Sequence, residues 1–254
     1  MIDLQSFNFA ANDYCELIKQ DGKISVYRAD IPKLGSIVVK QYELTNTIEK
    51  LSFRKKQKRL SRLYEKNFSF LPKLYRIGVS EDHQYGHVVY RHIEGVDLRK
   101  IDWSELSSEL TELIAQVIAE NLHALHNAGW VHGDFKFGNV MLDVSSLIDK
   151  NHVSIDEVSS HIHIVDVEAA KKPWLSSTNK KSRDIARFLI NAEEQSAPKE
   201  LSVSFWNAYQ EVEGVRNKGN ADGRRLRAAT KQWCHKLSKR HEKKYGKATG
   251  INFL

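Results

Sequence analysis

Apolar and polar positions alternate in short runs through the first third of the chain, which is the pattern of β-strands. Residues 22–30 (GKISVYRAD) and 35–44 (GSIVVKQYEL) are β-rich and are separated by the turn-prone IPKLG. Two more strands are predicted at residues 73–80 and 87–93, joined by the polar EDHQYG. Between these pairs, residues 47–66 change to helical spacing, with apolar side chains every three or four positions. The pattern therefore predicts a strand-rich part that contains one helix.

Beyond these strands the pattern becomes mainly helical. A long amphipathic helix is predicted from about residue 103 to residue 127, with Gly129 just past its end, where helices often stop. Two short strands, NVMLD and HIHIVDV, follow with a polar stretch between them, and everything beyond Ser182 is helical in pattern. A strand-rich half before a helix-rich half predicts a two-lobed α+β protein. We expect an N-lobe at 1–96 and a C-lobe at 97–254 with a basic helical C-terminus.

Composition places the chain among soluble globular proteins. Its 254 residues can bury a sizeable core, and 41% are hydrophobic and 28% charged. No run approaches the roughly 18 apolar residues of a membrane span, and the first residues lack the basic start and apolar block of a secretory signal. Two cysteines, Cys15 and Cys234, make no disulfide framework. We expect buried or idle thiols in a reducing cytoplasm.

Positive charge is concentrated in two segments. The formal net charge is +7, and residues 216–247 carry twelve Lys or Arg against two acidic residues, a net of +10. A second basic segment, residues 54–62, contains no acid. Such blocks indicate contact with phosphates, an acidic membrane surface or nucleic acid, and a solvated helix face is the plain alternative.

The strongest chemical signal is VHGDFKFGNVML at residues 131–142, followed by IVDVE at 164–168. Phosphoryl transfer needs a carboxylate that orients or deprotonates the attacking hydroxyl, and oxygen ligands that hold Mg²⁺ on the nucleotide phosphates. Asp134 can supply the carboxylate, and Asn139 and Asp166 can supply ligand oxygens. Mg²⁺ favours a few hard oxygen ligands and keeps some of its waters, which suits this small set.

The order H-G-D-x-K-x-x-N, followed by a strand that ends in Asp, resembles the catalytic and metal loops of protein-kinase-like enzymes. The resemblance implies that His132 begins the catalytic loop and that Asp134 is the catalytic aspartate. It implies that Lys136 neutralises charge on the transferred phosphoryl group. It also implies Mg²⁺ ligation by Asn139 and Asp166, with ATP as the phosphoryl donor. The fold implied is that of a protein kinase, strand-rich and then helical.

Upstream, Lys40 in SIVVKQY resembles the strand lysine that holds the α- and β-phosphates of ATP. The glycine-rich loop of the family is degenerate, and only Gly22 lies at a suitable distance before Lys40. The helix after Lys40 should carry a glutamate that pairs with it, and no residue fits well. Either Gln57 orients Lys40, or Glu49 does so from a shifted helix, or activity is weak.

Two further departures from the family pattern affect the loops themselves. Gly133 stands where many regulated kinases have an arginine, so control by activation-loop phosphorylation is not expected. The metal loop reads DVE, in which Glu168 is either a supporting or additional metal ligand or a surface acid. A polar insertion of undefined role occupies residues 143–163.

The segment after Asp166 is too short for a long activation segment with a peptide-docking platform. VDVEAAKK, KSRDIARFLINA and LSRLYEKNFSFLPKLYRIG resemble the bacterial lipopolysaccharide core kinases, which phosphorylate heptose or Kdo sugars. That resemblance implies a sugar hydroxyl on an anionic glycolipid as acceptor, at the cytoplasmic face of the inner membrane. It also implies that Asp184 holds the catalytic-loop backbone from a buried helix. The basic segment at 216–247 would then attract acidic headgroups as a peripheral contact, and nucleic acid is not the expected partner.

Three other interpretations remain open from the sequence. Small protein kinases of the RIO and Bud types share HGD and a short segment after the metal aspartate. Aminoglycoside-type phosphotransferases also carry HGD, but their cationic substrates need an acidic pocket. The third interpretation is a catalytically dead binding module, because no glutamate is well placed to pair with Lys40 and the glycine-rich loop is degenerate.

Overall fold

The computed structural model describes residues 15–32, 34–148, 153–173, 177–214 and 221–246. Part of the basic segment at 216–247 and part of the insertion at 143–163 lie outside these ranges. Internal contacts divide the chain into two compact units, Met1–Ile93 and Glu94–Leu254.

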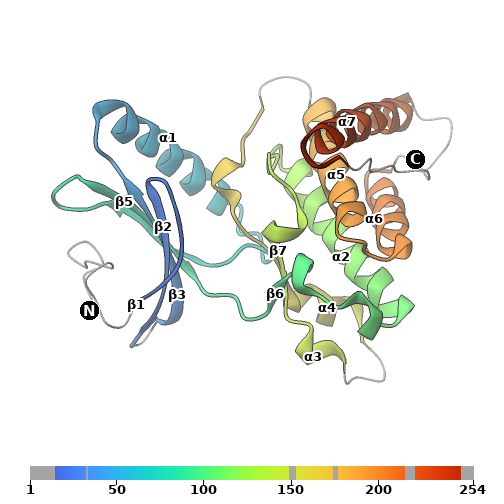
Figure 1. The fold of residues 1–254 in the computed structure, drawn as a ribbon, viewed down its shortest axis with the longest axis horizontal. Helices are drawn as coiled ribbons and strands as arrows, with labels where there is room; N and C mark the ends of the chain where they lie inside the picture. The colour runs from blue at the N-terminus through green and yellow to red at the C-terminus, as the bar shows by residue number, and fades with distance from the viewer. Residues whose placement is uncertain (1–14, 33, 149–152, 174–176, 215–220, 247–254) are drawn as a thin grey trace. The chain divides into compact units, whose positions relative to one another are not determined.

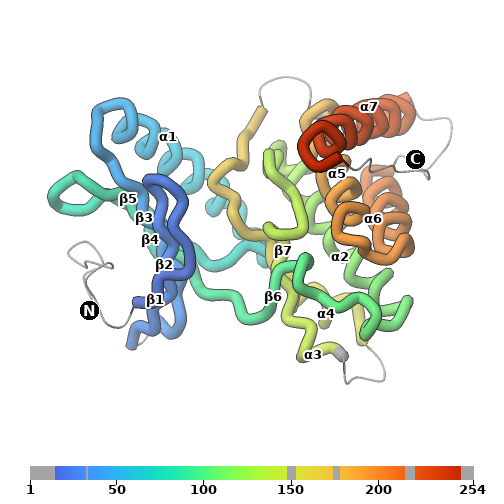
Figure 2. The backbone as a smooth tube through the Cα atoms, in the orientation of Figure 1, coloured from blue at the N-terminus to red at the C-terminus, as the bar shows by residue number. Residues whose placement is uncertain are grey.

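The first unit is a five-stranded antiparallel sheet in the order β1-β2-β3-β5-β4, with one helix. Its elements are β1 (Cys15–Asp21), β2 (Ile24–Ile31), β3 (Gly35–Glu43), α1 (Thr47–Tyr64), β4 (Leu74–Val79) and β5 (Tyr85–Arg91). A two-residue turn joins β1 to β2, and Gly22 opens it with a φ of 55°. Glycine favours this conformation because it has no Cβ. The chain path of the hairpin can be followed in Figure 2.

Alternation along β3 separates the two faces of this sheet. Ile37 and Val39 point into a hydrophobic cluster with Tyr27 and Val89. On the opposite face, the Tyr42 ring lies 5.5 Å from the Phe53 ring of α1. These contacts hold α1 alongside the sheet, as Figure 1 shows.

The second unit combines a small sheet with helices. Its three-stranded antiparallel sheet has the order β6-β7-β8, formed by Val96–Asp97, Val140–Leu142 and Ile162–Ile164. The helices are α2 (Ser108–Asn127), α3 (Ser145–Ile148), α4 (Ile155–His161), α5 (Ser177–Glu194), α6 (Lys199–Val212) and α7 (Ala221–Tyr245). No helix in the described ranges is long and apolar enough to cross a membrane.

Helix α5 is packed on two sides within this unit. Ala186 and Ile190 of α5 form a hydrophobic cluster with Cys234 of α7. The Phe188 ring lies 4.2 Å from the Phe205 ring of α6. Figure 1 shows α7 lying against α5, with α6 nearby. Because α6 and α7 pack against α5, the helix can hold its remaining side chains in fixed positions.

The α+β class, with the larger sheet first and the helices after it, is confirmed. Both cysteines are free, and Cys234 is buried. Elements that were not predicted include strand β1 and two helices within the polar insertion, α3 and α4. Ser154 caps α4, since its Oγ accepts a hydrogen bond from the Glu157 N–H at 3.2 Å. Serine followed three residues later by glutamate is a recognised helix-start signal.

Candidate active site

The loop that contains Asp134 is anchored from α5 by one buried carboxylate. Asp184 Oδ2 accepts a hydrogen bond from the His132 N–H at 2.7 Å, and Oδ1 accepts one from the Gly133 N–H at 2.9 Å. Asp184 is 1% exposed. The expectation that Asp184 holds the catalytic-loop backbone is therefore confirmed, and the alternative of an exposed helix acid is wrong.

Gly133 has a backbone reason to be glycine. Its φ is 85°, in the left-handed region, and an added Cβ would lie 3.2 Å from the Ala169 carbonyl oxygen. A side chain at this position would be strained, and the neighbouring segment would have to move. The missing arginine thus coincides with a backbone conformation that favours glycine.

A buried histidine completes the support of Asp184. His126 Nε2 lies 3.3 Å from Asp184 Oδ2, and His126 Nδ1 lies 2.7 Å from the Tyr209 hydroxyl. Burial lowers the pKa of His126 and raises that of Tyr209. A neutral imidazole satisfies both contacts when its Nε2–H donates to Asp184 and its Nδ1 accepts from Tyr209. Helices α2 and α6 therefore both contribute to holding the loop.

The Asp134 carboxylate lies between two cations. Lys136 Nζ is 2.8 Å from Oδ2, and Arg187 Nη2 is 2.6 Å from Oδ1. Arg187 was not predicted from the sequence. It lies three residues after Asp184 in α5, so both side chains share one helix face and reach the same loop.

Two amide side chains fix the rest of the loop. Asn139 Nδ2 donates to the Asp134 carbonyl oxygen at 2.8 Å. The Phe137 N–H donates to Asn191 Oδ1 at 2.8 Å, and Asn191 lies seven residues after Asp184 in α5. Asn191 was also missed, although this spacing from Asp184 returns to the same helix face. Asn139 is buried, and because its NH₂ group bonds Asp134, its amide oxygen is the atom left to accept a further contact.

Asp166 is tied to the catalytic loop through the residue before it. The Val165 N–H donates to the Asn139 carbonyl oxygen at 2.9 Å, and His132 Nε2 lies 3.0 Å from the Val165 carbonyl oxygen. Strand β7 begins directly after Asn139, and strand β8 ends two residues before Asp166. The two strands pair with Val140 opposite Ile164. The two proposed magnesium ligands therefore lie at the same end of one strand pair. Asp166 itself has a φ of 60°, a left-handed conformation that Asp tolerates better than most residues.

Glu168 is buried, with 6% of its surface exposed, so its interpretation as a surface acid is wrong. Among the residues that the structure describes, no group of three or more His, Cys, Asp and Glu could hold a metal ion. The candidate magnesium set is different, since it consists of one carboxylate and one amide oxygen. This small set of oxygen donors fits Mg²⁺, which retains several waters.

Lys40 and Gly22 belong to the first unit. In the sheet register Lys40 of β3 lies opposite Val26 of β2 and Val88 of β5, on the face that α1 covers.

The two residues suggested as partners of Lys40 both form other hydrogen bonds. The Glu49 carboxylate accepts hydrogen bonds from Lys23 Nζ at 2.7 Å and from Thr45, and the bond from Lys23 lowers its pKa to about 2. The Gln57 amide donates to the Ile77 carbonyl oxygen at 3.3 Å.

A family model described as the lipopolysaccharide kinase (Kdo/WaaP) family matches residues 32–209. The matched span contains Lys40, the catalytic loop, Asp166 and the anchoring residues of α5, and it ends at Tyr209. No curated protein sequence matches the chain.

Proposed function

Because the chain belongs to the lipopolysaccharide kinase (Kdo/WaaP) family, we propose that it transfers the γ-phosphate of ATP to a sugar hydroxyl of the lipopolysaccharide inner core. Members of this family are kinases, so the chain is an ATP-dependent phosphotransferase. The proposal adds the acceptor group, the residues that act and the place of action. We propose that the two compact units are the N-lobe and C-lobe of one kinase-like domain.

One observation carries the proposal most directly: the Asp134 segment is fixed at three points while its side chain stays partly exposed, although Oδ1 is buried. Asp184 holds the two N–H groups before it, and Asn139 holds its carbonyl oxygen. The side chain of Asp134 is 26% exposed. A carboxylate held in this way can receive a substrate hydroxyl without reorganising the loop.

In the proposed reaction the acceptor hydroxyl donates a hydrogen bond to Asp134. Its oxygen forms a bond to the γ-phosphorus of ATP while the bond from that phosphorus to the bridging oxygen breaks in line, and ADP leaves. The hydroxyl proton passes to the Asp134 carboxylate. Lys136 can turn from Asp134 toward the transferred phosphoryl group and offset its charge, since the lysine side chain is 40% exposed.

Magnesium bound here would neutralise phosphate charge and fix the orientation of the triphosphate. Asn139 and Asp166 are the residues that would hold it. We assign contact with the α- and β-phosphates to Lys40 and backbone contact with the nucleotide to Gly22. All four assignments rest on oxygen chemistry, strand position and family resemblance, and each can be tested by substituting the residue.

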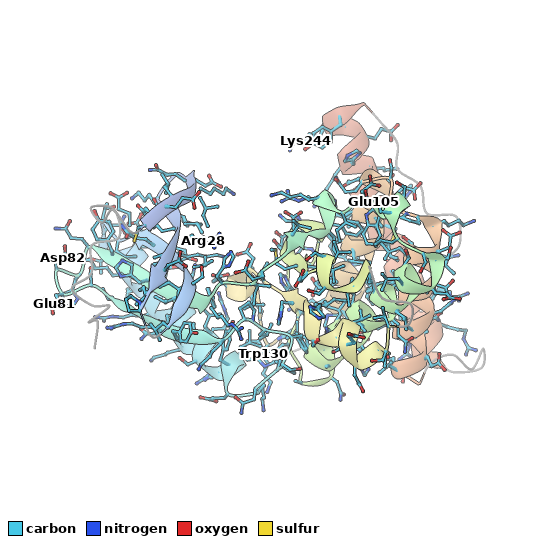
Figure 3. The ribbon with its side chains drawn as sticks, turned by 90° about the horizontal axis from the view of Figure 1, so that it is seen from below. Arg28, Glu81, Asp82, Glu105, Trp130 and Lys244 are labelled. Carbon is cyan, nitrogen blue, oxygen red and sulfur yellow. The ribbon has the colours of Figure 1, made fainter. Side chains whose placement is uncertain are left out.

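Helix α7 supports a peripheral contact with an anionic membrane. Its apolar side faces α5, and all nine of its Lys and Arg residues within Ala221–Tyr245 are exposed. Lys244 marks the C-terminal end of this basic face in Figure 3. Each such charge contributes on the order of 1 kcal/mol at an anionic lipid surface. We therefore place the enzyme at the cytoplasmic face of the membrane that carries its acceptor, where ATP is available.

The membrane contact is tested by co-sedimentation with phosphatidylcholine vesicles that contain or lack phosphatidylglycerol. Replacement of Lys236, Lys239 and Lys243 by Gln should weaken binding to the anionic vesicles, because the three lie on one face of α7. The matched control replaces Lys66, Lys100 and Lys199 by Gln, since these lysines are also exposed and lie outside both basic segments. Equal binding by the α7 variant and the wild type would reject this contact.

The function is tested by incubating the full chain with Mg²⁺, ATP carrying a radioactive γ-phosphate, and purified inner-core glycolipid. We expect label in the glycolipid, none when EDTA is added, and none in a protein substrate. Label in protein or in the chain itself, with none in the glycolipid, would support a protein kinase instead. Mass spectrometry of the product then identifies the hydroxyl that accepts phosphate.

A further inference from the structure

The side chain of Arg187 contacts the Asp134 carboxylate, the group proposed to receive the acceptor hydroxyl. Its Nη2 is 2.6 Å from Asp134 Oδ1, and its side chain is 32% exposed. It projects from α5, the helix whose Asp184 and Asn191 hold the same loop. The guanidinium is therefore positioned by a rigid element and still open to a ligand.

The hydrogen-bonding capacity of Arg187 is largely unused inside the protein. A guanidinium has five N–H donors in a planar fork. Among the described residues, the recorded partner of Arg187 is Asp134 alone. Most of its donors thus remain for a ligand that lies beside the Asp134 carboxylate.

Two cations, Lys136 and Arg187, contact the single Asp134 carboxylate. Lys136 is assigned to the transferred phosphoryl group, so its charge is matched when ATP is bound. The charge of Arg187 loses its partner during the reaction, because Asp134 becomes neutral as it takes the hydroxyl proton.

We propose that Arg187 binds an anionic group of the acceptor, a carboxylate or a phosphate, carried next to the hydroxyl that Asp134 receives. Arginine matches both groups through paired N–H···O bonds. The inference rests on the proposed function, since it takes Asp134 as the residue that meets the acceptor. It deepens that function by making the site selective for an acidic sugar.

Two other roles for Arg187 lead to different kinetics. If it only orients Asp134, its loss slows transfer to every acceptor by the same factor. If it binds the γ-phosphate, its loss also affects charged and neutral acceptors equally. Only contact with an anionic group of the acceptor makes the effect depend on that group.

The test measures kcat and KM of the full chain with four forms of delipidated inner-core oligosaccharide. They are the native form, a form whose carboxylates are converted to methyl amides, a form without phosphates, and a form with both changes. Methyl amides remove the charge without adding a hydroxyl. The enzymes compared are wild type, Arg187→Gln, Arg187→Lys and, as control, Lys180→Gln, which removes an exposed positive charge from the same helix.

We expect wild type to prefer the native form over the doubly neutral form by about tenfold or more in kcat/KM, the value of one charge-assisted pair. In Arg187→Gln this preference should fall to about one, mainly through KM of the native acceptor, while KM for ATP stays unchanged. Arg187→Lys should keep part of the preference, and Lys180→Gln should keep all of it. The two singly modified forms reveal whether the carboxylate or the phosphate is the group bound.

An unchanged preference in Arg187→Gln overturns the inference and leaves the proposed function intact. Equal loss on all four forms does the same and assigns Arg187 to orienting Asp134 or to the γ-phosphate. If wild type phosphorylates none of the four forms and no intact glycolipid, the proposed function fails and the inference with it. Circular dichroism of each variant shows whether a loss of activity is a loss of folding.

Discussion

The Asp184 carboxylate of α5 accepts a hydrogen bond from the backbone N–H of Gly133 at 2.9 Å, although 51 residues separate them in the chain. This bond and its neighbour at His132 join helix α5 of the second unit to the loop that carries Asp134. The loop therefore takes its position from the helix core. Substitutions far from any substrate should thus affect turnover.

Asp184→Asn should lower both activity and stability. An amide offers one oxygen where the carboxylate has two, so its NH₂ group would confront either the Gly133 N–H or the donors at Oδ2. We expect a loss of about 1–3 kcal/mol in the free energy of unfolding. We also expect at least a roughly tenfold fall in kcat, because Asp134 is displaced. Urea unfolding and steady-state kinetics measure the two effects. Glu193→Gln, an exposed change on the same helix, is the control, and equal behaviour of the two variants would contradict this role of Asp184.

Asp166→Asn should weaken the dependence of nucleotide binding on magnesium. The change removes the only carboxylate assigned to the ion and leaves the amide of Asn139. Thermal shift with ATP should show a smaller magnesium-dependent rise in Tm than wild type, whereas the surface variant Asp156→Asn should match wild type. An undiminished magnesium effect in Asp166→Asn would exclude Asp166 from the metal site.

Acid should weaken the link among three helices at Glu213. His123 of α2 lies 2.9 Å from the Glu213 carboxylate, and Lys181 of α5 lies 3.0 Å from it. The hydrogen bond from His123, together with that from Lys181, lowers the pKa of Glu213 from 4.5 to about 2. A lowered carboxylate pKa stabilises the folded state above the ordinary value, and the contribution disappears as pH falls through the folded value. We expect wild type to exceed Glu213→Gln by on the order of 2 kcal/mol at neutral pH, with the gap closing between about pH 4.5 and pH 2. Unfolding of both proteins across this range measures the gap, and a gap that does not change with pH would contradict the assignment.

Gly95→Ala should be one of the more damaging glycine substitutions in the second unit. Gly95 has a φ of 106°, and a Cβ there would lie 2.4 Å from the carbonyl oxygen of Leu142 in β7, which is backbone and cannot turn aside. We expect a loss of roughly 2–4 kcal/mol from the clash and the backbone strain together. Gly214→Ala is the matched control, since its φ of 66° is also positive but nothing lies within 4 Å of the added atom. Equal losses in urea unfolding would show that the contact with β7 does not matter.

The order of elements was predictable because period-2 and period-3.6 patterns are local properties of the chain. The spacing of Asp134, Asn139 and Asp166 identified the loops, since the chemistry of phosphoryl transfer constrains these residue types in this order. Asp184 was found through resemblance, and its two bonds to the loop now give the physical reason. Helix α4 was not predicted because the segment around it is polar, although Ser154 and Glu157 have the spacing of a capping box.

What could not be predicted depends on contacts between distant segments. Arg187 reads as an ordinary helix cation until α5 is placed against the catalytic loop. The burial of Glu168 depends on the packing of the segment around it, and hydrophobicity alone assigns glutamate to the surface. The hydrogen bond from Lys23 to Glu49 could not be predicted, because it depends on the turn between β1 and β2 lying near the start of α1.

The most direct test of the account is transfer of phosphate from ATP to inner-core glycolipid by wild type and by Asp134→Asn. The substitution keeps the size of the side chain but removes the carboxylate that would receive the hydroxyl proton. The account predicts labelled glycolipid with wild type and a fall of about 100-fold or more with the variant, at unchanged Tm. Equal rates from the two proteins would contradict the role of Asp134 and, with it, the assignment of the site.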